Sequence, residues 1–273
     1  MPRKEFFDII VYMKKLITPY AASFGRPNVT IKHFADGESY VRVVPKIKGK
    51  TIIYHRLYPE PEKRFFELLL ILSKTKASDV FIPYLPYARQ DKENKQGEAV
   101  SADVLCRLLK NANVKKLITY DCHFLPRAGK FKRAGLEIEN RSAGGELYQY
   151  AKRYFKHKAF VVVSPDEGAS YFTEYAQGHS FRLKKKRKKH NEVKYIKGEV
   201  NVRGKNVCIL DDIIDTGDTI RRAIEHLQKN GAKRIIVGAT HGIFSKGKIK
   251  KANLVFTTDS IPNSHSVIAL ASP

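Results

Sequence analysis

Short apolar runs recur along this chain, and most of them end in polar residues. They occupy residues 51–55, 80–84, 117–121, 159–164, 207–211, 234–238 and 254–259. Helical periodicity fills the intervals between them, at residues 64–76, 101–111, 145–154 and 220–229. Alternating strand and helix patterns favour right-handed βαβ units and a largely parallel sheet. Because the strands divide into two sets near residue 141, we expect two doubly wound α/β domains, residues 1–141 and 142–273.

The strongest candidate for a functional site is the segment VCILDDIIDTGDT, residues 207–219. Its apolar start suits a strand buried on both faces of a parallel sheet, so Asp211 and Asp212 should lie at the carboxyl end, where such sheets bind ligands. The loop that follows offers backbone N–H groups, hydroxyls and a helix N-terminus, which together can cradle a phosphate. Acids beside a phosphate cradle seem contradictory, because carboxylates and phosphate are both negatively charged. A sugar placed between the acids and the cradle removes the conflict, since carboxylates can accept hydrogen bonds from ribose hydroxyls or hold a metal. The alternative is that the acids merely cap the next helix.

This segment resembles the phosphoribosyl-pyrophosphate-binding motif of type I phosphoribosyltransferases and their relatives. The resemblance implies that Asp211 and Asp212 contact the ribose hydroxyls and a metal. It also implies that the 5-phosphate is held by the loop residues Asp215, Thr216, Gly217, Asp218 and Thr219. Asp218 stands where many relatives carry Gly, and its carboxylate must point outward or it would repel the ligand.

Composition describes an ordinary globular protein, with 42% hydrophobic and 29% charged residues. No apolar run approaches the roughly 18 residues needed to span a bilayer, and the N-terminus lacks the pattern of a signal peptide. Cys106, Cys122 and Cys208 are widely spaced and fit neither a zinc pattern nor a disulfide framework. We therefore expect a protein of the reducing cytoplasm with no membrane partner.

The net charge of +24 has two interpretations. It could indicate a nucleic-acid-binding module, because neutralised phosphates drive such binding. Alternatively, a Lys-rich surface attracts anionic substrates. Aromatic-basic repeats, helix-turn-helix signals and zinc-finger spacing are absent from the sequence, so nucleic acid is not the partner we expect.

Five further segments match one family residue by residue. They are HFADGESYVR (33–42), PYLPYARQD (83–91), TYDCH (119–123), SPDEG (164–168) and ATHGIFS (239–245). With residues 207–219 they resemble the ribose-phosphate diphosphokinases, also called phosphoribosyl-pyrophosphate synthetases. The resemblance implies two phosphoribosyltransferase-like domains. It also implies an enzyme that moves the diphosphoryl group of ATP to the C1 hydroxyl of ribose 5-phosphate and releases AMP.

The resemblance assigns ATP binding to two segments. Phe34 would stack on adenine, while Asp36 and Glu38 would accept hydrogen bonds from the nucleotide. In the family this segment reaches a neighbouring subunit, which implies a homo-oligomer with a shared ATP site. Without the resemblance, Phe34 is a core residue that precedes an Asp-Gly β-turn. Arg89 and Gln90 directly follow a predicted strand, and Arg89 is either a bidentate phosphate donor or one half of a surface salt bridge.

The resemblance also implies a magnesium ion at the ATP phosphates, with His123 and Asp166 as ligands. Magnesium prefers oxygen ligands and usually keeps several waters, so a histidine ligand is uncommon chemistry. The alternatives are that His123 pairs with a backbone group and that Asp166 caps a helix.

The basic run at residues 182–189 matches a loop that carries a Lys-x-Arg pair in the family, best aligned to Lys185 and Arg187. Such a like-charged run should be mobile until an anion binds. These two side chains would neutralise charge during phosphoryl transfer, and Arg187 would also reach ribose 5-phosphate. Lys184 or Lys186 could instead take the Lys role, and the run could be merely a solvated surface.

Two other functions stay open for a chain of this kind. A phosphoribosyltransferase would consume the activated sugar, but the N-terminal segments at 34–38 and 89–90 argue against it. A non-catalytic regulatory homologue would keep the fold without turnover, but the set of His123, Asp211, Asp212 and the basic pair is intact.

Overall fold

The computed structural model describes residues 14–44, 49–165, 170–176, 180–183, 185–189, 192–195 and 201–273. The chain divides into two compact units. Unit 1 comprises Met1–Ile82, Asp103–Ile118 and Lys132–Ile138, and unit 2 comprises Pro83–Ala102, Thr119–Phe131 and Glu139–Pro273. Each unit takes three separate segments of the chain, so a single sequence boundary at residue 141 stays a prediction.

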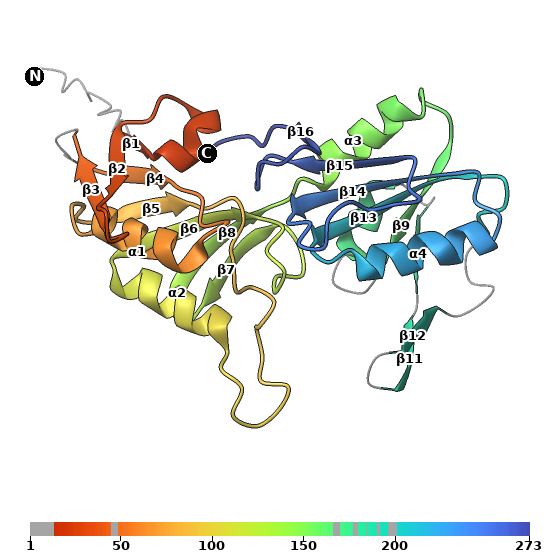
Figure 1. Ribbon diagram of the computed structural model, residues 1–273, viewed down its shortest axis with the longest axis horizontal. Helices are drawn as coiled ribbons and strands as arrows, with labels where there is room; N and C mark the ends of the chain where they lie inside the picture. Colours follow the sequence, from red (N-terminus) through yellow and green to blue (C-terminus); the bar gives the residue numbers. More distant parts are fainter. Residues whose placement is uncertain are drawn as a thin grey trace, which may run out of the picture. The chain divides into compact units, whose positions relative to one another are not determined.

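The first six-stranded sheet has the order β1-β4-β5-β6-β8-β7 (Figure 1). Its parallel part consists of β1 (Lys14–Ile17), β4 (Thr51–Tyr54), β5 (Ser78–Phe81) and β6 (Val114–Tyr120). The remaining strands are β8 (Leu136–Arg141) and β7 (Gly129–Arg133). The helices are α1 (Pro61–Leu72), α2 (Ser101–Asn111) and the short 3-10 helix η1 (Pro19–Phe24). Pro61 suits the first turn of α1 because its φ is already helical and no N–H is lost there.

An antiparallel hairpin accompanies this sheet. It consists of β2 (Val29–His33) and β3 (Ser39–Val43), paired from Val29↔Val43 to His33↔Ser39. Its turn therefore contains residues 34–38, to which the resemblance assigns ATP binding. Asp36 Oδ1 accepts a hydrogen bond from Glu38 N at 3.0 Å. Gly37 has a φ of 93°, a backbone conformation in which any residue with a side chain would be strained.

The second six-stranded sheet lies in unit 2 and is parallel at every pairing. Its order is β10 (Ser180–Arg182), β9 (Phe160–Ser164), β13 (Asn206–Ile214), β14 (Arg234–Gly242), β15 (Leu254–Thr258) and β16 (Ser266–Ile268). From β9 the chain passes through η2 (Ser170–Ala176) to β10 on one side, and later returns to β13 on the other. Open α/β sheets bind ligands at such a switch point, beyond the carboxyl ends of the strands. Here those are the ends of β9 and β13.

Two helices cover opposite faces of this second sheet. Helix α4 (Asp218–Lys229) buries Ile220, Ala223, Ile224 and Leu227 in a cluster that also contains Val207, Ile209, Ile235 and Val237. Val255 packs against the same cluster, whereas the ring of the next residue, Phe256, lies 4.6 Å from that of Tyr150 in α3 (Gly144–Tyr154). Successive strand residues point to opposite faces, so α3 and α4 sandwich the sheet.

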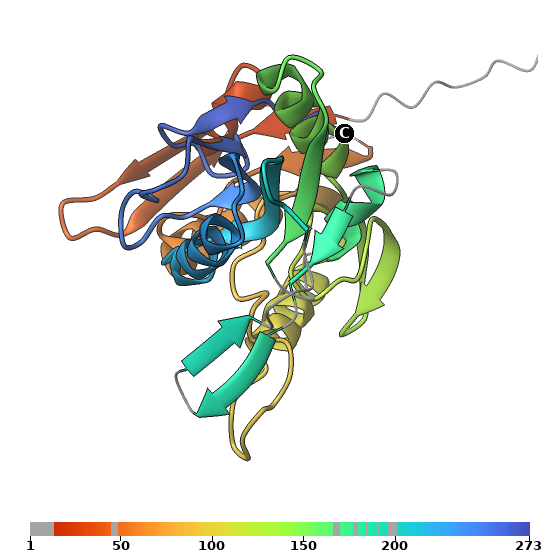
Figure 2. The same cartoon turned by 90° about the vertical axis from the view of Figure 1, so that its right-hand side faces the viewer.

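The predicted α/β class with mainly parallel sheets is confirmed, and each predicted strand and helix has a counterpart. Two differences concern the site. Strand β13 runs to Ile214, past the two acids, because Ile213 and Ile214 still pair with His241 and Gly242 of β14. In the basic run, β11 (Lys185–Lys189) pairs antiparallel with β12 (Glu192–Tyr195) and stands apart from the six-stranded sheet (Figure 2). In the parts of the chain that the structure describes, no helix is both long and apolar enough to cross a membrane.

Candidate functional site

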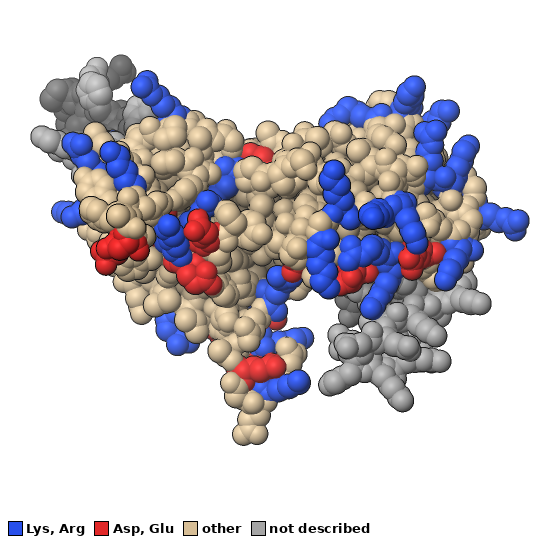
Figure 3. All heavy atoms as spheres, in the orientation of Figure 1, with Lys and Arg blue, Asp and Glu red and all other residues tan. Residues whose placement is uncertain are grey.

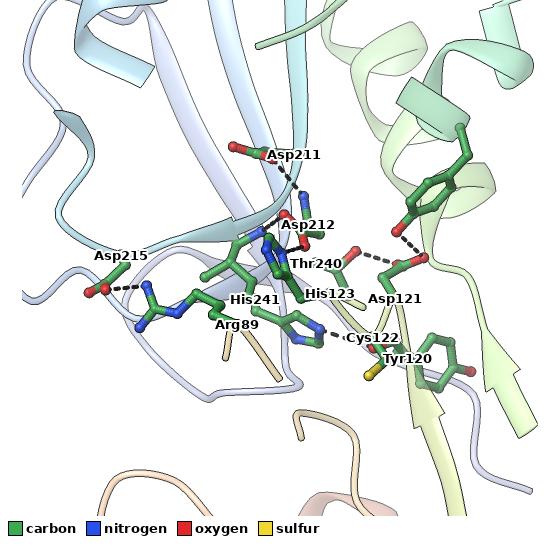
Figure 4. Close-up of polar contacts among 12 residues, drawn as sticks. Arg89, Tyr120, Asp121, Cys122, His123, Asp211, Asp212, Asp215, Thr240 and His241 are labelled. Atoms are coloured by element: carbon green, nitrogen blue, oxygen red, sulfur yellow. Dashed lines mark hydrogen bonds and ion pairs between the residues drawn. The ribbon is translucent and has the colours of Figure 1, made fainter. Parts of the chain in front are cut away.

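Two adjacent acids near the end of β13 form the base of the candidate site (Figure 4). Asp211 and Asp212 are 4% and 5% exposed. Asp211 Oδ1 accepts a hydrogen bond from the backbone N–H of Asp212 at 3.0 Å, and Asp212 Oδ1 accepts one from Ile213 at 2.8 Å. The backbone of the strand therefore fixes both carboxylates.

His123 contacts the second of these acids. Its Nδ1 donates a hydrogen bond to Asp212 Oδ2 over 2.6 Å. Burial alone would raise the pKa of Asp212, but the hydrogen bond from His123, the charge of that imidazole when it is protonated, and the hydrogen bond with Asp211 bring that pKa below its usual value. Asp212 is therefore ionised at neutral pH. By accepting the Nδ1 proton it also selects the tautomer whose Nε2 carries the lone pair that a metal requires.

A pocket of about 190 Å³ lies over the acids and is lined by Arg89, His123 and residues 211–220. All of these belong to unit 2. The structure thus brings together four features that the sequence predicted separately: an arginine, a histidine, two acids and a phosphate-type loop. A larger hollow of about 610 Å³ is lined by residues of α3 and β16, including Glu146 and Arg153, but its lining contains no comparable pair of acids.

Arg89 contacts the loop that follows β13. Its Nη1 lies 2.5 Å from Asp215 Oδ2, and about half of the arginine side chain is exposed. Burial opposes ionisation of Asp215, yet the Ser245 hydrogen bond and Arg89 hold its pKa below the usual value. The prediction that Arg89 directly follows a strand is wrong, because β5 ends at Phe81. The nearby Pro83 lacks the N–H that a continuing strand would use.

The loop itself depends on one glycine. Gly217 has a φ of 76°, and a Cβ there would lie 2.2 Å from Ile249 Cδ1 and 3.0 Å from Arg221 Nη1. Any side chain at residue 217 would therefore both strain the backbone and displace two neighbours. Helix α4 starts directly afterwards, at Asp218, two residues earlier than its apolar periodicity predicts. The helix N-terminus and the loop amides are consequently next to each other, as a phosphate cradle requires.

Sequence reasoning missed two cations beside this loop. Arg221 Nη2 donates to Asp218 Oδ1 at 2.6 Å and to the Thr216 carbonyl at 2.7 Å. Lys246 Nζ lies 3.5 Å from Asp218 Oδ2. The available signal was the position of Arg221, three residues after an acid on a predicted helix, where the two side chains are neighbours.

A buried carboxylate two residues before His123 was also missed. Asp121 accepts hydrogen bonds from Thr240 Oγ1 at 2.5 Å, from Ala143 N at 2.9 Å and from Tyr171 OH at 3.0 Å. Burial raises its pKa to about 6. His241 is also buried, and its Nε2 donates to the Tyr120 carbonyl at 3.1 Å. The relevant signal was that polar residues stand at the ends of predicted strands, with Asp121 closing the run at 117–121 and Thr240 and His241 following the run at 234–238.

In unit 1, the ATP-binding candidates Phe34, Asp36 and Glu38 lie on the β2–β3 turn. Phe34 is 57% exposed, so it is not the core residue that the alternative interpretation required. The hairpin is held by Glu67 of α1, whose Oε1 lies 2.8 Å from His33 Nε2 and 3.1 Å from Ser39 Oγ. An exposed ring on an anchored turn is available for stacking.

The other predicted residues have less structural definition. Gln90 Oε1 accepts a hydrogen bond from Ser101 Oγ at 2.8 Å, at the start of α2. Asp166 lies outside the described residues. Lys185 and Arg187 belong to β11, where the structure describes the backbone alone.

Among the residues that the structure describes, no three acids, histidines or cysteines converge in the manner of a protein-only metal cage. Magnesium does not need one, because it usually binds one or two carboxylates and keeps waters and substrate phosphates as its other ligands. The ionised Asp212 and its histidine partner are compatible with such a site.

Two protein-family models match most of the chain. The N-terminal domain of ribose phosphate pyrophosphokinase matches residues 15–112, and the phosphoribosyl transferase domain matches residues 136–271. The chain is 34% identical to the ribose-phosphate pyrophosphokinase of Thermococcus kodakarensis, over 89% of each chain. It is 35% identical to the enzyme of Pyrococcus abyssi, over 89% of this chain and 87% of the relative.

A solved structure gives the same result. The phosphoribosylpyrophosphate synthetase from Mycobacterium smegmatis superposes with a TM-score of 0.74, at 25% sequence identity, over 92% of this chain and 89% of that one. Fold, pocket and sequence similarity therefore agree with the resemblance drawn from the motifs. The chain belongs to the ribose-phosphate pyrophosphokinase family.

Proposed function

We propose that this protein transfers the diphosphoryl group of ATP to the C1 hydroxyl of ribose 5-phosphate, giving 5-phosphoribosyl 1-diphosphate and AMP for nucleotide biosynthesis. The observation that carries the proposal is the unit 2 pocket, where two buried acids lie next to a phosphate-type loop. Acids suit the sugar hydroxyls, and the loop suits the phosphate. A bare phosphate site would have no use for the acids.

The acceptor half of the reaction is the β13 end and its loop. Asp211 and Asp212 would accept hydrogen bonds from the ribose hydroxyls and orient C1. The loop from Asp215 to Thr219 would hold the 5-phosphate through its amides, hydroxyls and the start of α4. Because the acids are fixed before the sugar binds, little orientation entropy is left to lose at the reaction step.

The donor half would use Arg89 and Gln90 for the ATP phosphates and base. Phe34, Asp36 and Glu38 would bind the adenosine of an ATP bound to a neighbouring subunit. This arrangement makes the active enzyme a homo-oligomer with a shared ATP site. The exposure of Phe34 supports it, because an aromatic ring at a turn contributes little unless another surface covers it.

The chemical step would be a direct displacement. The C1 hydroxyl oxygen loses its proton to solvent and bonds to the β-phosphorus, the bond from that phosphorus to the oxygen shared with the α-phosphate breaks, and AMP leaves. Lys185 and Arg187 would stabilise the charge on the transferred and leaving oxygens, and Arg187 would also contact ribose 5-phosphate. Closure of their segment over the site would exclude water, which competes with the sugar hydroxyl.

A Mg²⁺ ion would be held by His123 and Asp166, with the phosphates of ATP completing its shell. Its contribution would be to neutralise phosphate charge. Asp212 would serve this site by keeping His123 in the correct tautomer. We place the enzyme in the cytoplasm, and its three cysteines are buried and form no disulfide, as a reducing compartment allows.

The test is to incubate the purified protein with ATP, Mg²⁺ and ribose 5-phosphate and to separate the products by chromatography. We expect AMP and 5-phosphoribosyl 1-diphosphate in equal amounts, and neither without the sugar. A protein that binds both substrates without turnover would be a regulatory homologue. Consumption of added 5-phosphoribosyl 1-diphosphate with a nucleobase would instead identify a phosphoribosyltransferase.

A further inference from the structure

Asp218 places a negative charge inside a loop that should bind a phosphate, and the structure surrounds this charge with donors. Thr216 Oγ1 donates to Asp218 Oδ2 at 2.9 Å, and Arg221 Nη2 donates to Oδ1 at 2.6 Å. Lys246 Nζ lies 3.5 Å from Oδ2. The hydrogen bond from Arg221, followed by that from Thr216, lowers the pKa of Asp218 to about 2. Its carboxylate is therefore charged at any physiological pH.

The donors come from three parts of the site. Thr216 lies in the phosphate loop, Arg221 one turn into α4, and Lys246 in the segment that follows β14. Basic side chains gather over the α4 region with acids among them (Figure 3). Arg221 also donates to the Thr216 carbonyl, so it belongs to the loop as much as to the helix.

This set of donors is the set that a phosphate monoester would need. It contains a hydroxyl, a guanidinium and an ammonium group, all next to a helix N-terminus. Resting on the function proposed above, we propose that Asp218 is a built-in competitor of the sugar 5-phosphate, and that Arg221 and Lys246 are additional ligands of that phosphate. On binding, the phosphate takes the three donors over from the carboxylate.

The exchange is favourable because the two anions differ in charge. A carboxylate offers two oxygens and a single charge, whereas a phosphate monoester offers three oxygens and nearly two charges at neutral pH. The incoming phosphate therefore forms the stronger charge-assisted bonds. Each of them must first be released from Asp218, so the competitor weakens net affinity. It also favours a dianionic ligand over a singly charged one.

The decisive variant is Asp218→Asn, which keeps the size of the side chain and removes its charge. Asp218 is about half exposed, so the substitution should not disturb folding, which a melting temperature would verify. We expect the KM for ribose 5-phosphate at saturating MgATP to fall roughly fivefold, the effect of one like charge at contact distance in water. The KM for ATP should not change. An unchanged or raised KM for ribose 5-phosphate would overturn the proposal.

Helix α4 supplies a matched control in Glu225. Glu225 is also exposed, and it forms an ion pair with Lys251, which lies in the segment after β14 as Lys246 does. The distance from Lys251 Nζ to Glu225 Oε1 is 3.0 Å. Glu225→Gln removes the same charge from the same helix, two turns away from the loop. It should leave both KM values unchanged. If it lowers the KM for ribose 5-phosphate as much as Asp218→Asn does, the effect is one of general surface charge and direct competition is refuted.

The cations provide the reciprocal test. Arg221→Ala should raise the KM for ribose 5-phosphate, both alone and combined with Asp218→Asn, and Lys246→Ala should raise it less because of its longer contact. If Arg221→Ala leaves this KM unchanged in both backgrounds, Arg221 is not a phosphate ligand. Wild-type protein that forms AMP only with sugar present supports the proposed function, whatever the variants do. If it forms none, calorimetric titration with ribose 5-phosphate still ranks the variants by affinity.

Discussion

Each unit of this protein contains a histidine paired with a buried acid, and the two pairs are nearly alike in distance and burial. In unit 1, His33 Nε2 lies 2.8 Å from Glu67 Oε1, and in unit 2, His123 Nδ1 lies 2.6 Å from Asp212 Oδ2. The imidazoles are 35% and 36% exposed, and the acid side chains 0% and 7%. Distance and burial alone would assign both pairs the same role.

Their surroundings differ. Glu67 lies on a helix and also accepts hydrogen bonds from Ser39 and Tyr20, so it ties together the hairpin, η1 and α1. Its other oxygen, Oε2, is buried without a hydrogen bond to any described residue. Asp212 lies on a strand next to a second acid and lines a pocket. The comparison teaches that a histidine–acid pair becomes a candidate for chemistry only where other polar groups face the same open space.

The largest expected effect is on turnover, from Asp212→Asn. The variant keeps the shape of the side chain but loses the charge that orients His123 and that, in the proposed function, contacts the sugar. With His123 as the proposed metal ligand, we expect the rate of AMP formation to fall by about 100-fold, the upper end of the loss when a group that orients a metal ligand is removed. The melting temperature should change little. A variant that unfolds more readily yet keeps its rate when folded would show that this pair is structural, and the contrast between units would disappear.

Glu67→Gln should show the opposite pattern. The amide oxygen can keep the hydrogen bonds that Oε1 accepts, but the N–H₂ group then takes the place of Oε2, which has no hydrogen bond to any described residue, so a buried donor is left unsatisfied. We expect the free energy of unfolding to fall by about 1–3 kcal/mol, measured by urea denaturation. The kcat of the folded protein should stay close to that of the wild type. A large loss of kcat with normal stability would instead assign Glu67 a part in catalysis.

The smallest expected effect is on folding stability at low pH, and it again differs between the two units. Burial lowers the pKa values of His55 in unit 1 and His241 in unit 2 to about 4. Below the unfolded value of 6.5 the unfolded chain takes up the proton first, so each histidine destabilises the fold progressively as the pH falls from 6.5 to 4. In unit 2 the raised pKa of Asp121 acts in the other direction, since the folded state takes up that proton first, between pH 6 and 3.8.

Acidification from pH 7 to 5 should therefore lower the stability of unit 1 by roughly 1–2 kcal/mol more than that of unit 2, where the effects of His241 and Asp121 oppose each other. Amide hydrogen exchange, corrected for its intrinsic pH dependence, would measure this in β4 and β13 separately. His55→Gln should remove the acid sensitivity of unit 1. Equal losses of protection in both sheets would contradict the assignment.

Much of the fold could be predicted from the sequence, because buried parallel strands and amphipathic helices have strong periodic patterns. The strands that escaped prediction are short or polar. Strand β7 has the sequence GKFKR and β11 the sequence KKRKK. Neither has a local strand pattern, because both form strands only by pairing with a neighbouring strand. The end of β13 was misplaced for a related reason: pairing with β14 continues through residues that looked like the start of a loop.

The candidate site was predictable as a list of residues but not as a network. Asp211, Asp212 and the loop after them stand in one recognisable segment. The partners of the loop do not, since Lys246 is separated from Asp218 by 28 positions and is one lysine among many. Asp121 was overlooked because its bonds go to Thr240 and Tyr171, on elements that meet it only in the folded chain.

The continuation of β13 beyond its two acids has a consequence for how this site can change over time. Asp211 pairs with Ala239, and the pairing resumes at Ile213 and Ile214, so the acids cannot shift without breaking the sheet. Their positions are therefore fixed once the chain has folded. New ligand preferences would have to arise at the edge of the site, in the 215–219 loop and the segment after β14. A single change of charge there alters which ligands bind and leaves the positions of the two acids unchanged.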